Sequence, residues 1–283
     1  MGGGFVPISV GMSANPSLFI SHGGPNIVTD DTPARDFLKG LSNLVGRPKA
    51  IVIVSAHFET GGVSVVTDPN PGMIYDFGGF APELYQMVYP APGSPELAQR
   101  VAALLDKAGL APGRMPQRGY DHGTWTPLFL AYPQADIPVV QVSVDPDRDA
   151  RWHYAVGRAL APLAGEGVLM IGSGHITHNL RAIFPVMRGG APVDKAMVDK
   201  VEAFTGWFAE KLGAGDIEAV LDWKAEAPYP AENHPSDEHL MPLFFALGAA
   251  GAEAAGRRVH ASRQFGFFAF DAYLFGPQAF ETP

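Results

Sequence analysis

Hydrophobic and polar positions alternate along the chain in blocks that predict strands and helices in turn. Five short apolar runs, rich in β-branched residues, are too apolar for half-exposed strands and suit central strands buried on both faces. These runs cover residues 17–21, 50–55, 63–67, 137–144 and 168–171. Because amphipathic helical patterns separate them, the sequence predicts an α/β fold with a central, mostly parallel or mixed sheet flanked by helices.

The clearest predicted helix starts after Ser94. The Ser94 hydroxyl can cap the helix, Pro95 suits the first helical position, and Glu96 places an acid in the first turn. The last two apolar runs, 258–264 and 267–274, predict a C-terminal β-hairpin. Further helical patterns cover residues 33–45, 149–163, 193–212, 216–224 and 236–250.

Residues 68–95 break this pattern, because they carry many prolines, glycines and aromatic residues with little helical or strand period. An ordered loop of this length usually covers or lines a site. We therefore expect the segment to lie over a functional site and to exclude water from it. The alternative is an ordinary surface excursion.

Composition excludes several classes of protein. With 47% hydrophobic residues in 283, the chain can bury a large core, and we expect one domain spanning residues 1–283. The net charge of −9 and the lack of a basic run argue against a nucleic-acid partner. No apolar run approaches the roughly 18 residues that cross a bilayer, so we expect no membrane association. No Lys or Arg precedes Arg35, which predicts a cytoplasmic protein without a signal peptide.

The absence of cysteine removes thiolate chemistry and Cys-ligated metals, so any metal must bind nitrogen or oxygen. The histidines are the candidates. His22 and His57 directly follow two predicted strands, and His175 and His178 follow a third. Ligands of open α/β sheets bind at the C-terminal edge of the strands. The sequence therefore predicts a mononuclear metal site at that edge, with further histidine clusters at 120–125 and 233–239 available to it.

Five sequence blocks, taken in order, resemble a known family. The chain is similar over nearly its whole length to the class III extradiol ring-cleaving dioxygenases, specifically the 4,5-DOPA extradiol dioxygenase group related to the protocatechuate 4,5-dioxygenase catalytic subunit. The blocks are His22-Gly23-Gly24-Pro25, Ser55-Ala56-His57, Asp121-His122-Gly123 followed by Trp125, Gly172-Ser173-Gly174 with His178-Asn179-Leu180, and His234-Pro235 with Glu238-His239.

The resemblance implies that His22, His57 and His234 hold the metal, with His178 as a fourth ligand or as the acid/base. His122 would be a second catalytic imidazole that faces the substrate without holding metal. Fe(II) is expected for activity, and Zn(II) is often present in the isolated proteins of this group. The implied reaction is extradiol cleavage of a small-molecule catechol by O2, which gives a muconic semialdehyde.

The residues themselves leave alternative ligands open. Glu238 is the runner-up, because it lies four residues after His234 and could share a helical face with it. Glu59 is a third candidate, because a continued strand would place it on the same side as His57. His175 departs from the family pattern and would compete for the metal or reshape the pocket.

The substrate wall and the reaction class also have alternatives. Four aromatic residues could contact an aromatic ring or could simply pack the core, namely Tyr75, Phe77, Phe80 and Trp125. A zinc hydrolase would use the same imidazoles to activate a bound water. A non-enzymatic reading is a binding protein stabilised by its metal.

Overall fold

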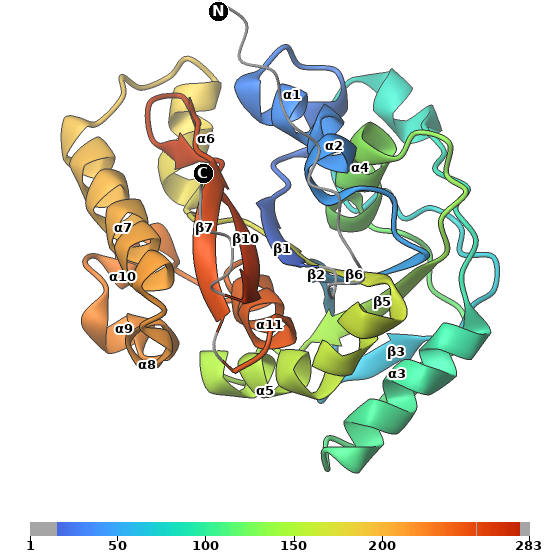
Figure 1. Ribbon diagram of the computed structural model, residues 1–283. Helices are drawn as coiled ribbons and strands as arrows, with labels where there is room; N and C mark the ends of the chain where they lie inside the picture. The colour runs from blue at the N-terminus through green and yellow to red at the C-terminus, as the bar shows by residue number, and fades with distance from the viewer. Residues whose placement is uncertain (1–15, 253, 278–283) are drawn as a thin grey trace, which may run out of the picture.

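The strands of the computed structural model, which describes residues 16–252 and 254–277, form an eight-stranded mixed sheet and a separate hairpin (Figure 1). They are β1 (Ser17–Ser21), β2 (Ala50–Glu59), β3 (Ser64–Val66), β4 (Gly113–Met115), β5 (Val139–Val144), β6 (Val168–Gly174), β7 (Ala254–His260), β8 (Arg263–Gln264), β9 (Phe268–Ala269) and β10 (Ala272–Pro277). The strand order in the large sheet is β4-β3-β5-β2-β6-β1-β10-β7. Residues 1–15, on which the expectation of no signal peptide rests, lie outside the described residues.

Four parallel strands form the centre of the sheet in the order β5-β2-β6-β1. β10 pairs with β1, and β7 with β10, in antiparallel orientation. The mixed sheet predicted from the sequence is therefore confirmed. The predicted C-terminal hairpin is also present as β8 and β9, with Gly266 at a φ of +79° in the intervening turn. Glycine adopts this left-handed conformation without a steric penalty.

Alternate residues of β2 point into two separate hydrophobic cores, one on each face of the sheet. Val52 and Val54 belong to one core and Ile51 and Ile53 to the other, and all four are at most 1% exposed. A strand buried on both faces must be apolar at every position. This is why the central strands could be recognised as continuous apolar runs.

Helices cover both faces of the sheet (Figure 1). They are α1 (Pro33–Lys39), α2 (Leu41–Val45), α3 (Pro95–Lys107), α4 (His122–Ala131), α5 (Ala150–Leu160), α6 (Leu180–Met187), α7 (Lys195–Ala214), α8 (Ile217–Leu221), α9 (Trp223–Glu226), α10 (Pro230–Asn233) and α11 (Met241–Ala249). α3, α5, α7 and α11 contribute to the core that contains Val52, and α1 and α4 to the other. In the part of the chain that the structure describes, no helix has both the length and the apolarity needed to cross a membrane.

The helix boundaries differ from the predicted ones where tertiary contacts intervene. α3 begins as predicted, with the Ser94 hydroxyl accepting a hydrogen bond from the Leu97 amide. The helix expected at 236–250 begins only at Met241, because the residues before it form a turn tied to β6. The start of α4 at His122 was not predicted. Nearly all its residues are buried, so its sequence carries no amphipathic stripe.

α5 and α11 pack with their backbones in contact. A Cβ atom at Gly248 of α11 would lie 2.1 Å from the carbonyl oxygen of Tyr154 in α5. Backbone atoms cannot move aside as the end of a flexible side chain can. The close approach of these two helices therefore requires glycine at this position.

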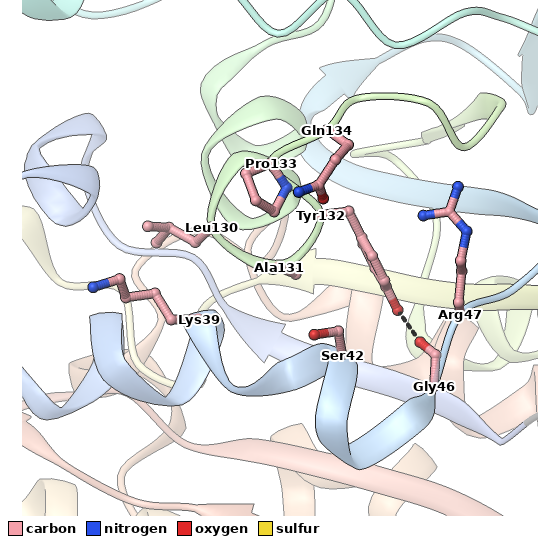
Figure 2. Close-up of a pocket in the computed structure, with 9 residues that line it drawn as sticks. All are labelled: Lys39, Ser42, Gly46, Arg47, Leu130, Ala131, Tyr132, Pro133 and Gln134. Atoms are coloured by element: carbon pink, nitrogen blue, oxygen red, sulfur yellow. Dashed lines mark hydrogen bonds between the residues drawn. The ribbon is translucent and has the colours of Figure 1, made fainter.

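A surface hollow of about 470 Å³ lies between α2 and the end of α4 (Figure 2). The Tyr132 hydroxyl donates a 2.8 Å hydrogen bond to the Gly46 carbonyl there. Lys39 and Arg47 line the hollow, but its lining includes none of the nine histidines. The chemistry that the sequence predicts therefore lies elsewhere in the molecule.

Gly248→Ala should destabilise the protein by roughly 1–3 kcal/mol, because the added methyl group overpacks the interface between α5 and α11. The matched control is Gly206→Ala in α7, where an added Cβ would meet nothing within 4 Å. That exposed substitution should stabilise the helix by about 0.5–1 kcal/mol. Urea unfolding monitored by circular dichroism measures both changes. Equal stability of Gly248→Ala and wild type would contradict the packing argument.

Candidate metal centre

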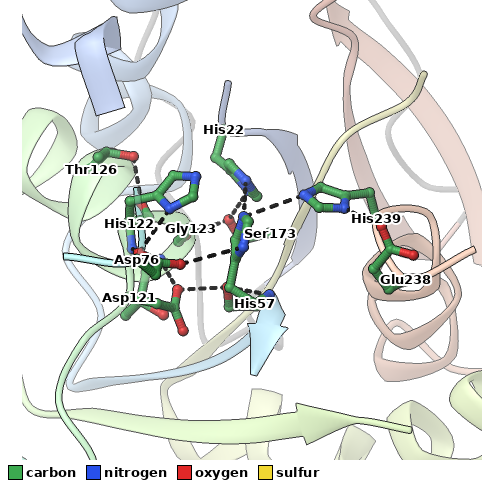
Figure 3. A network of polar contacts seen from close by, with 12 residues as sticks. His22, His57, Asp76, Asp121, His122, Gly123, Thr126, Ser173, Glu238 and His239 are labelled. Carbon is green, nitrogen blue, oxygen red and sulfur yellow. Dashed lines mark hydrogen bonds and ion pairs between the residues drawn. The ribbon is translucent and has the colours of Figure 1, made fainter. Parts of the chain in front are cut away.

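Four histidine rings gather beside the C-terminal ends of β1 and β2 and point toward one another (Figure 3). His22 directly follows β1, His57 lies near the end of β2, His122 begins α4, and His239 lies in the turn before α11. Neighbouring ring centroids are 4.0–5.7 Å apart. The structure thus brings His22, His57 and His122 together at the sheet edge that the sequence indicated.

Three of these rings direct their Nε2 atoms at one region. The Nε2 atoms of His22 and His57 are 3.1 Å apart, and those of His57 and His239 are 3.3 Å apart. Nitrogen ligands at about 2.1 Å from a metal ion are separated by about 3.0 Å in a cis octahedral arrangement and about 3.4 Å in a tetrahedral one. The two observed separations lie between these values, so each of these two pairs has the spacing of neighbouring ligands of one metal ion.

The other ring nitrogen of His22 is held by a serine. His22 Nδ1 lies 3.0 Å from Ser173 Oγ, and that hydroxyl donates its own proton to the Gly123 carbonyl at 2.5 Å. Because the Ser173 proton is already used, the hydroxyl accepts a hydrogen bond from His22 Nδ1. This leaves a lone pair on His22 Nε2, which is the form of imidazole that binds metal.

Carboxylates hold the Nδ1 atoms of the other rings. Glu238 Oε1 is 2.8 Å from His239 Nδ1. Asp76 Oδ2 is 3.4 Å from His57 Nδ1, and Asp76 Oδ1 is 2.9 Å from His122 Nδ1. Ionised carboxylates only accept hydrogen bonds, so the Nδ1 atoms of His239 and His122 carry a proton, and Asp76 favours the same for His57. Carboxylate–histidine pairs of this kind orient metal ligands in known sites.

Burial keeps these imidazoles neutral. It lowers the pKa of His22 and His239 well below 6.5, and the neighbouring histidines lower both values further. Burial together with the charge of His122 lowers the pKa of His57 to about 4. At pH 7 the three rings therefore offer unprotonated nitrogens, which the binding of a metal requires.

A close approach of two backbones places His239 beside β6. The His175 amide donates a 2.8 Å hydrogen bond to the His239 carbonyl. A Cβ at Gly174 would lie 2.1 Å from that same carbonyl oxygen, so only glycine permits the contact. The Gly174 carbonyl also accepts a 3.0 Å hydrogen bond from the His22 amide. Gly174 therefore lies between the two segments that carry His22 and His239.

A buried ion pair fixes α4 against β2. Asp121 caps α4, accepting hydrogen bonds from the Thr124 amide and, at 2.7 Å, from the Ser55 hydroxyl. Its second oxygen accepts a 2.7 Å hydrogen bond from Arg118, which also donates to the His57 carbonyl at 3.2 Å. These contacts explain why the Ser55 and Asp121 blocks accompany the histidines in the sequence.

The structure does not bring His234 to this cluster. Its Nε2 lies 2.9 Å from the Ile176 carbonyl, and its ring packs against Phe204 and Trp223 with centroids 5.7 and 5.8 Å apart. His239, five residues later, lies where the sequence had indicated His234. A local signal was available, because Glu238 directly precedes His239 and supplies the carboxylate partner that a ligating histidine usually has.

His178 lies beside the cluster rather than within it. Its ring stacks on His239 with a centroid separation of 3.4 Å, and its Nδ1 is 3.6 Å from Glu238 Oε1. Burial, followed by the neighbouring histidines, lowers its pKa to about 3. Two sets of side chains bring possible ligand atoms within 4.8 Å of one another: His22, His57 and His122 form one, and His178, Glu238 and His239 form the other. Glu238, the alternative ligand considered from the sequence, thus contacts the Nδ1 atoms of His239 and His178.

The two remaining candidates lie apart from the converging nitrogens. Glu59 is an exposed residue at the end of β2. The buried His175 ring stacks on Phe268 of the C-terminal hairpin, with centroids 4.0 Å apart and planes at 16°. His175 therefore packs against the C-terminal hairpin rather than among the converging nitrogens.

The segment at residues 68–95 supplies a functional residue that sequence reasoning missed. Asp76 contacts both His57 and His122, and although burial opposes the effect, hydrogen bonds from His122 lower the pKa of Asp76 to about 2. The Phe77 ring lies 5.9 Å from that of His122. Trp125 is fully buried in the core. Only a carboxylate within an aromatic loop pointed to Asp76, which is too weak a signal to distinguish it from Asp68.

Comparisons with known proteins identify relatives of this chain. Residues 13–272 match the family model described as the catalytic LigB subunit of aromatic ring-opening dioxygenase. The chain is 43% identical to a 4,5-DOPA dioxygenase extradiol of Beta vulgaris, covering 92% of this chain and 96% of that protein. It is 38% identical to a protein of the same name from Escherichia coli K12, covering 83% and 84%.

A solved structure shares the fold. It is the crystal structure of an uncharacterized protein from Escherichia coli K12, which superposes with a TM-score of 0.73 at 31% sequence identity. The match covers 92% of this chain and 99% of that one. The α/β architecture is therefore found in a related protein over nearly its full length.

The buried histidines predict how stability depends on pH. Burial lowers the pKa of His57, His153 and His234 from 6.5 to about 4. Such groups bind fewer protons in the folded chain than in the unfolded chain between pH 4 and 6.5. The metal-free protein should therefore be most stable above pH 6.5 and lose stability as the pH falls toward 4, by about 1.4 kcal/mol per pH unit for each histidine.

His153 allows a control outside the cluster, because its Nε2 accepts a hydrogen bond from the Asp145 amide. His153→Gln keeps an acceptor there but cannot titrate. Urea unfolding of the metal-free protein at several pH values between 4 and 7 should give a slope that is shallower by about 1.4 kcal/mol per pH unit in this variant. An unchanged slope would show that His153 titrates normally in the folded protein.

Proposed function

This chain belongs to the LigB family of aromatic ring-opening dioxygenases, and from that premise we propose that it cleaves a catechol ring with O2 at an extradiol bond. The product would be a muconic semialdehyde that contains both oxygen atoms. The name of the relatives from Beta vulgaris and Escherichia coli makes DOPA the first catechol to test. We further propose that residues 1–283 act as one catalytic domain. A cytoplasmic location stays a prediction from the sequence.

We propose His22, His57 and His239 as the metal ligands. The proposal rests on the convergence of their Nε2 atoms. The atoms of His22 and His57 are 3.1 Å apart, and those of His57 and His239 are 3.3 Å apart. The Nδ1 atoms of His22 and His239 make hydrogen bonds to a serine and a carboxylate, and that of His57 lies 3.4 Å from the Asp76 carboxylate. Three imidazoles on one side of an ion leave the opposite positions open, as ferrous oxygenases require.

The metal would supply the redox chemistry that the side chains lack. Fe(II), the expected ion for activity, would polarise both catechol oxygens and activate O2, whereas Zn(II) could fill the same nitrogen site without redox chemistry. Three neutral imidazoles add no negative charge to the ion. The site therefore favours substrates that bind through anionic oxygens.

We propose His178 as the base that prepares the catechol. Burial keeps the ring unprotonated at pH 7, as a base must be, although a pKa of about 3 by itself makes it a weak one. Glu238 lies 3.6 Å from its Nδ1 and would stabilise the imidazolium formed. The stacking of His178 on His239 holds it directly beside the metal ligands.

We propose His122 as the second catalytic imidazole. Its Nδ1 is engaged by Asp76 at 2.9 Å, and its ring centroid lies 4.0 Å from that of His57. When protonated, the ring would be paired with Asp76 and could donate from Nε2 to a substrate oxygen. Phe77, 5.9 Å away, would border the aromatic substrate and limit the entry of water.

The proposed ligand set predicts opposite outcomes at two neighbouring histidines. His239→Ala should lose bound Zn(II) or Fe(II), because it removes one of the three converging nitrogens. His234→Gln should keep the metal, because His234 bonds to the Ile176 carbonyl instead. Metal content per chain after dialysis, measured by plasma mass spectrometry, distinguishes the two. Retention of metal by His239→Ala and its loss from His234→Gln would restore His234 as the ligand.

The reaction itself is tested with metal-free protein reconstituted anaerobically with Fe(II) and then exposed to air with DOPA and simple catechols. We expect uptake of about one O2 per catechol consumed and a coloured semialdehyde, because both oxygen atoms enter the product. Zn(II)-loaded protein should take up no O2. Hydrolysis of esters or amides by the Zn(II) form, with no O2 uptake under Fe(II), would favour the hydrolase alternative.

His122→Ala is the matched variant for this assay. It should bind as much Fe(II) as wild type and lower turnover by roughly 10²-fold, the scale expected for loss of a general acid or base. Wild-type turnover in the variant would mean that His122 is structural.

A further inference from the structure

We propose that Asp76 is a positioning residue shared by the metal ligand His57 and the catalytic imidazole His122. One carboxylate, carried by the aromatic segment at residues 68–95, then sets the protonated nitrogen of both rings. This inference rests on the roles proposed above for His57 and His122, although its geometry stands independently of them.

The contacts of Asp76 divide between the two rings (Figure 3). Its Oδ1 accepts hydrogen bonds from His122 Nδ1 at 2.9 Å and from the His122 backbone amide at 3.0 Å. Its Oδ2 lies 3.4 Å from His57 Nδ1. The two rings lie side by side, with centroids 4.0 Å apart, so one carboxylate reaches both.

The consequence is a matched pair of tautomers. A carboxylate can only accept hydrogen bonds, so it favours the proton on Nδ1 of each ring and leaves a lone pair on each Nε2. A carboxylate partner also makes the imidazole a stronger metal ligand. Without Asp76, either ring could carry its proton on Nε2, and that proton would block His57 from binding metal.

The backbone around Asp76 holds it in register with His122. The Ile74 amide donates to the Tyr120 carbonyl at 2.8 Å, and the Tyr120 amide donates to the Gly72 carbonyl at 2.8 Å. These bonds form a short parallel bridge between Met73 and Tyr120, three residues before Asp76 and two before His122. The same pairing therefore positions the carboxylate and the ring that it binds.

The hydrogen bonds of the neighbouring tyrosines complete the anchorage of the segment. The Tyr75 hydroxyl donates to the Met87 carbonyl at 2.8 Å. Tyr85 donates to the carbonyl of Phe77 at 3.4 Å. Asp76 is thus fixed from both sides, and a disturbance of this segment would reach the metal ligand through it.

The first experiment reads the tautomers in metal-free, full-length protein by ¹⁵N NMR of the imidazoles. We expect Nδ1-protonated His57 and His122 in the wild type. In Asp76→Asn the side-chain amide presents one acceptor and one donor, so one ring, expected to be His57, should change to the Nε2-protonated form. An Nε2-protonated His57 or His122 in the wild type, or unchanged tautomers in Asp76→Asn, would overturn the proposal.

The second experiment measures the affinity for Zn(II) by competition with a chromophoric chelator. Asp76→Asn should bind Zn(II) 10–100-fold more weakly, the usual effect of losing a partner of a ligating histidine. Asp76→Glu, which keeps the charge, should recover part of this loss. The control is Asp68→Asn, the same chemical change in the same segment. Among the described residues, the Asp68 carboxylate accepts a hydrogen bond from the Asn70 amide at 2.9 Å and contacts none of the histidines. The control variant should bind Zn(II) like the wild type.

The two experiments separate this inference from the proposed function. A wild-type protein that binds no Zn(II) or Fe(II) would defeat the proposed function, while the tautomers would still decide the role of Asp76. If Asp76→Asn does not fold, two measurements still test the role of Asp76. They are the tautomers of His57 and His122 in the wild type and the Zn(II) affinity of Asp76→Glu. Equal Zn(II) affinity of folded Asp76→Asn and Asp68→Asn would show that Asp76 does not position His57.

Discussion

The convergence of three imidazole nitrogens in a buried space is the constraint on which the rest of this structure depends. Neutral rings whose Nε2 lone pairs face one another at 3.1 and 3.3 Å repel unless a cation lies between them. Protonation of more than one ring would place positive charges next to one another in a region of low dielectric, and burial lowers the pKa of all three rings. The arrangement is therefore stable only if the Nδ1 atoms are held firmly from outside.

Two carboxylates supply most of this support, and each does so for a pair of rings. Asp76 contacts His57, a proposed ligand, and His122, a proposed catalytic residue, while Glu238 contacts His239, a proposed ligand, and His178. In the proposed reaction, each carboxylate would orient one ring toward the metal and stabilise the positive charge that forms on the other. Metal binding and proton transfer would then share the same supporting groups, so a change in either carboxylate would alter both.

The central strands and the histidines at their ends could be predicted from the sequence because both depend on local sequence patterns. The central strands are buried on both faces, so each reads as a continuous apolar run, and residues 17–21 were predicted without error. The strand prediction also indicated that His22 and His57 lie close together, because parallel strands place their C-terminal ends at one edge of the sheet. α4 was less visible, because a helix buried on all sides carries no amphipathic stripe.

The remaining ligand and its support were decided only by the tertiary structure. His234 and His239 lie in one segment, and Glu238 beside His239 is a local signal that favours His239 only weakly. The direction of each side chain depends on how that turn docks against Gly174 of β6. Asp76 lies in a loop without a period, and it reaches His57 and His122 only through backbone pairing beside Tyr120. The sequence determined which residue types would gather and at which edge of the sheet, since periodicity and strand ends are local properties. Which ring faces inward is set by contacts between segments far apart in the chain.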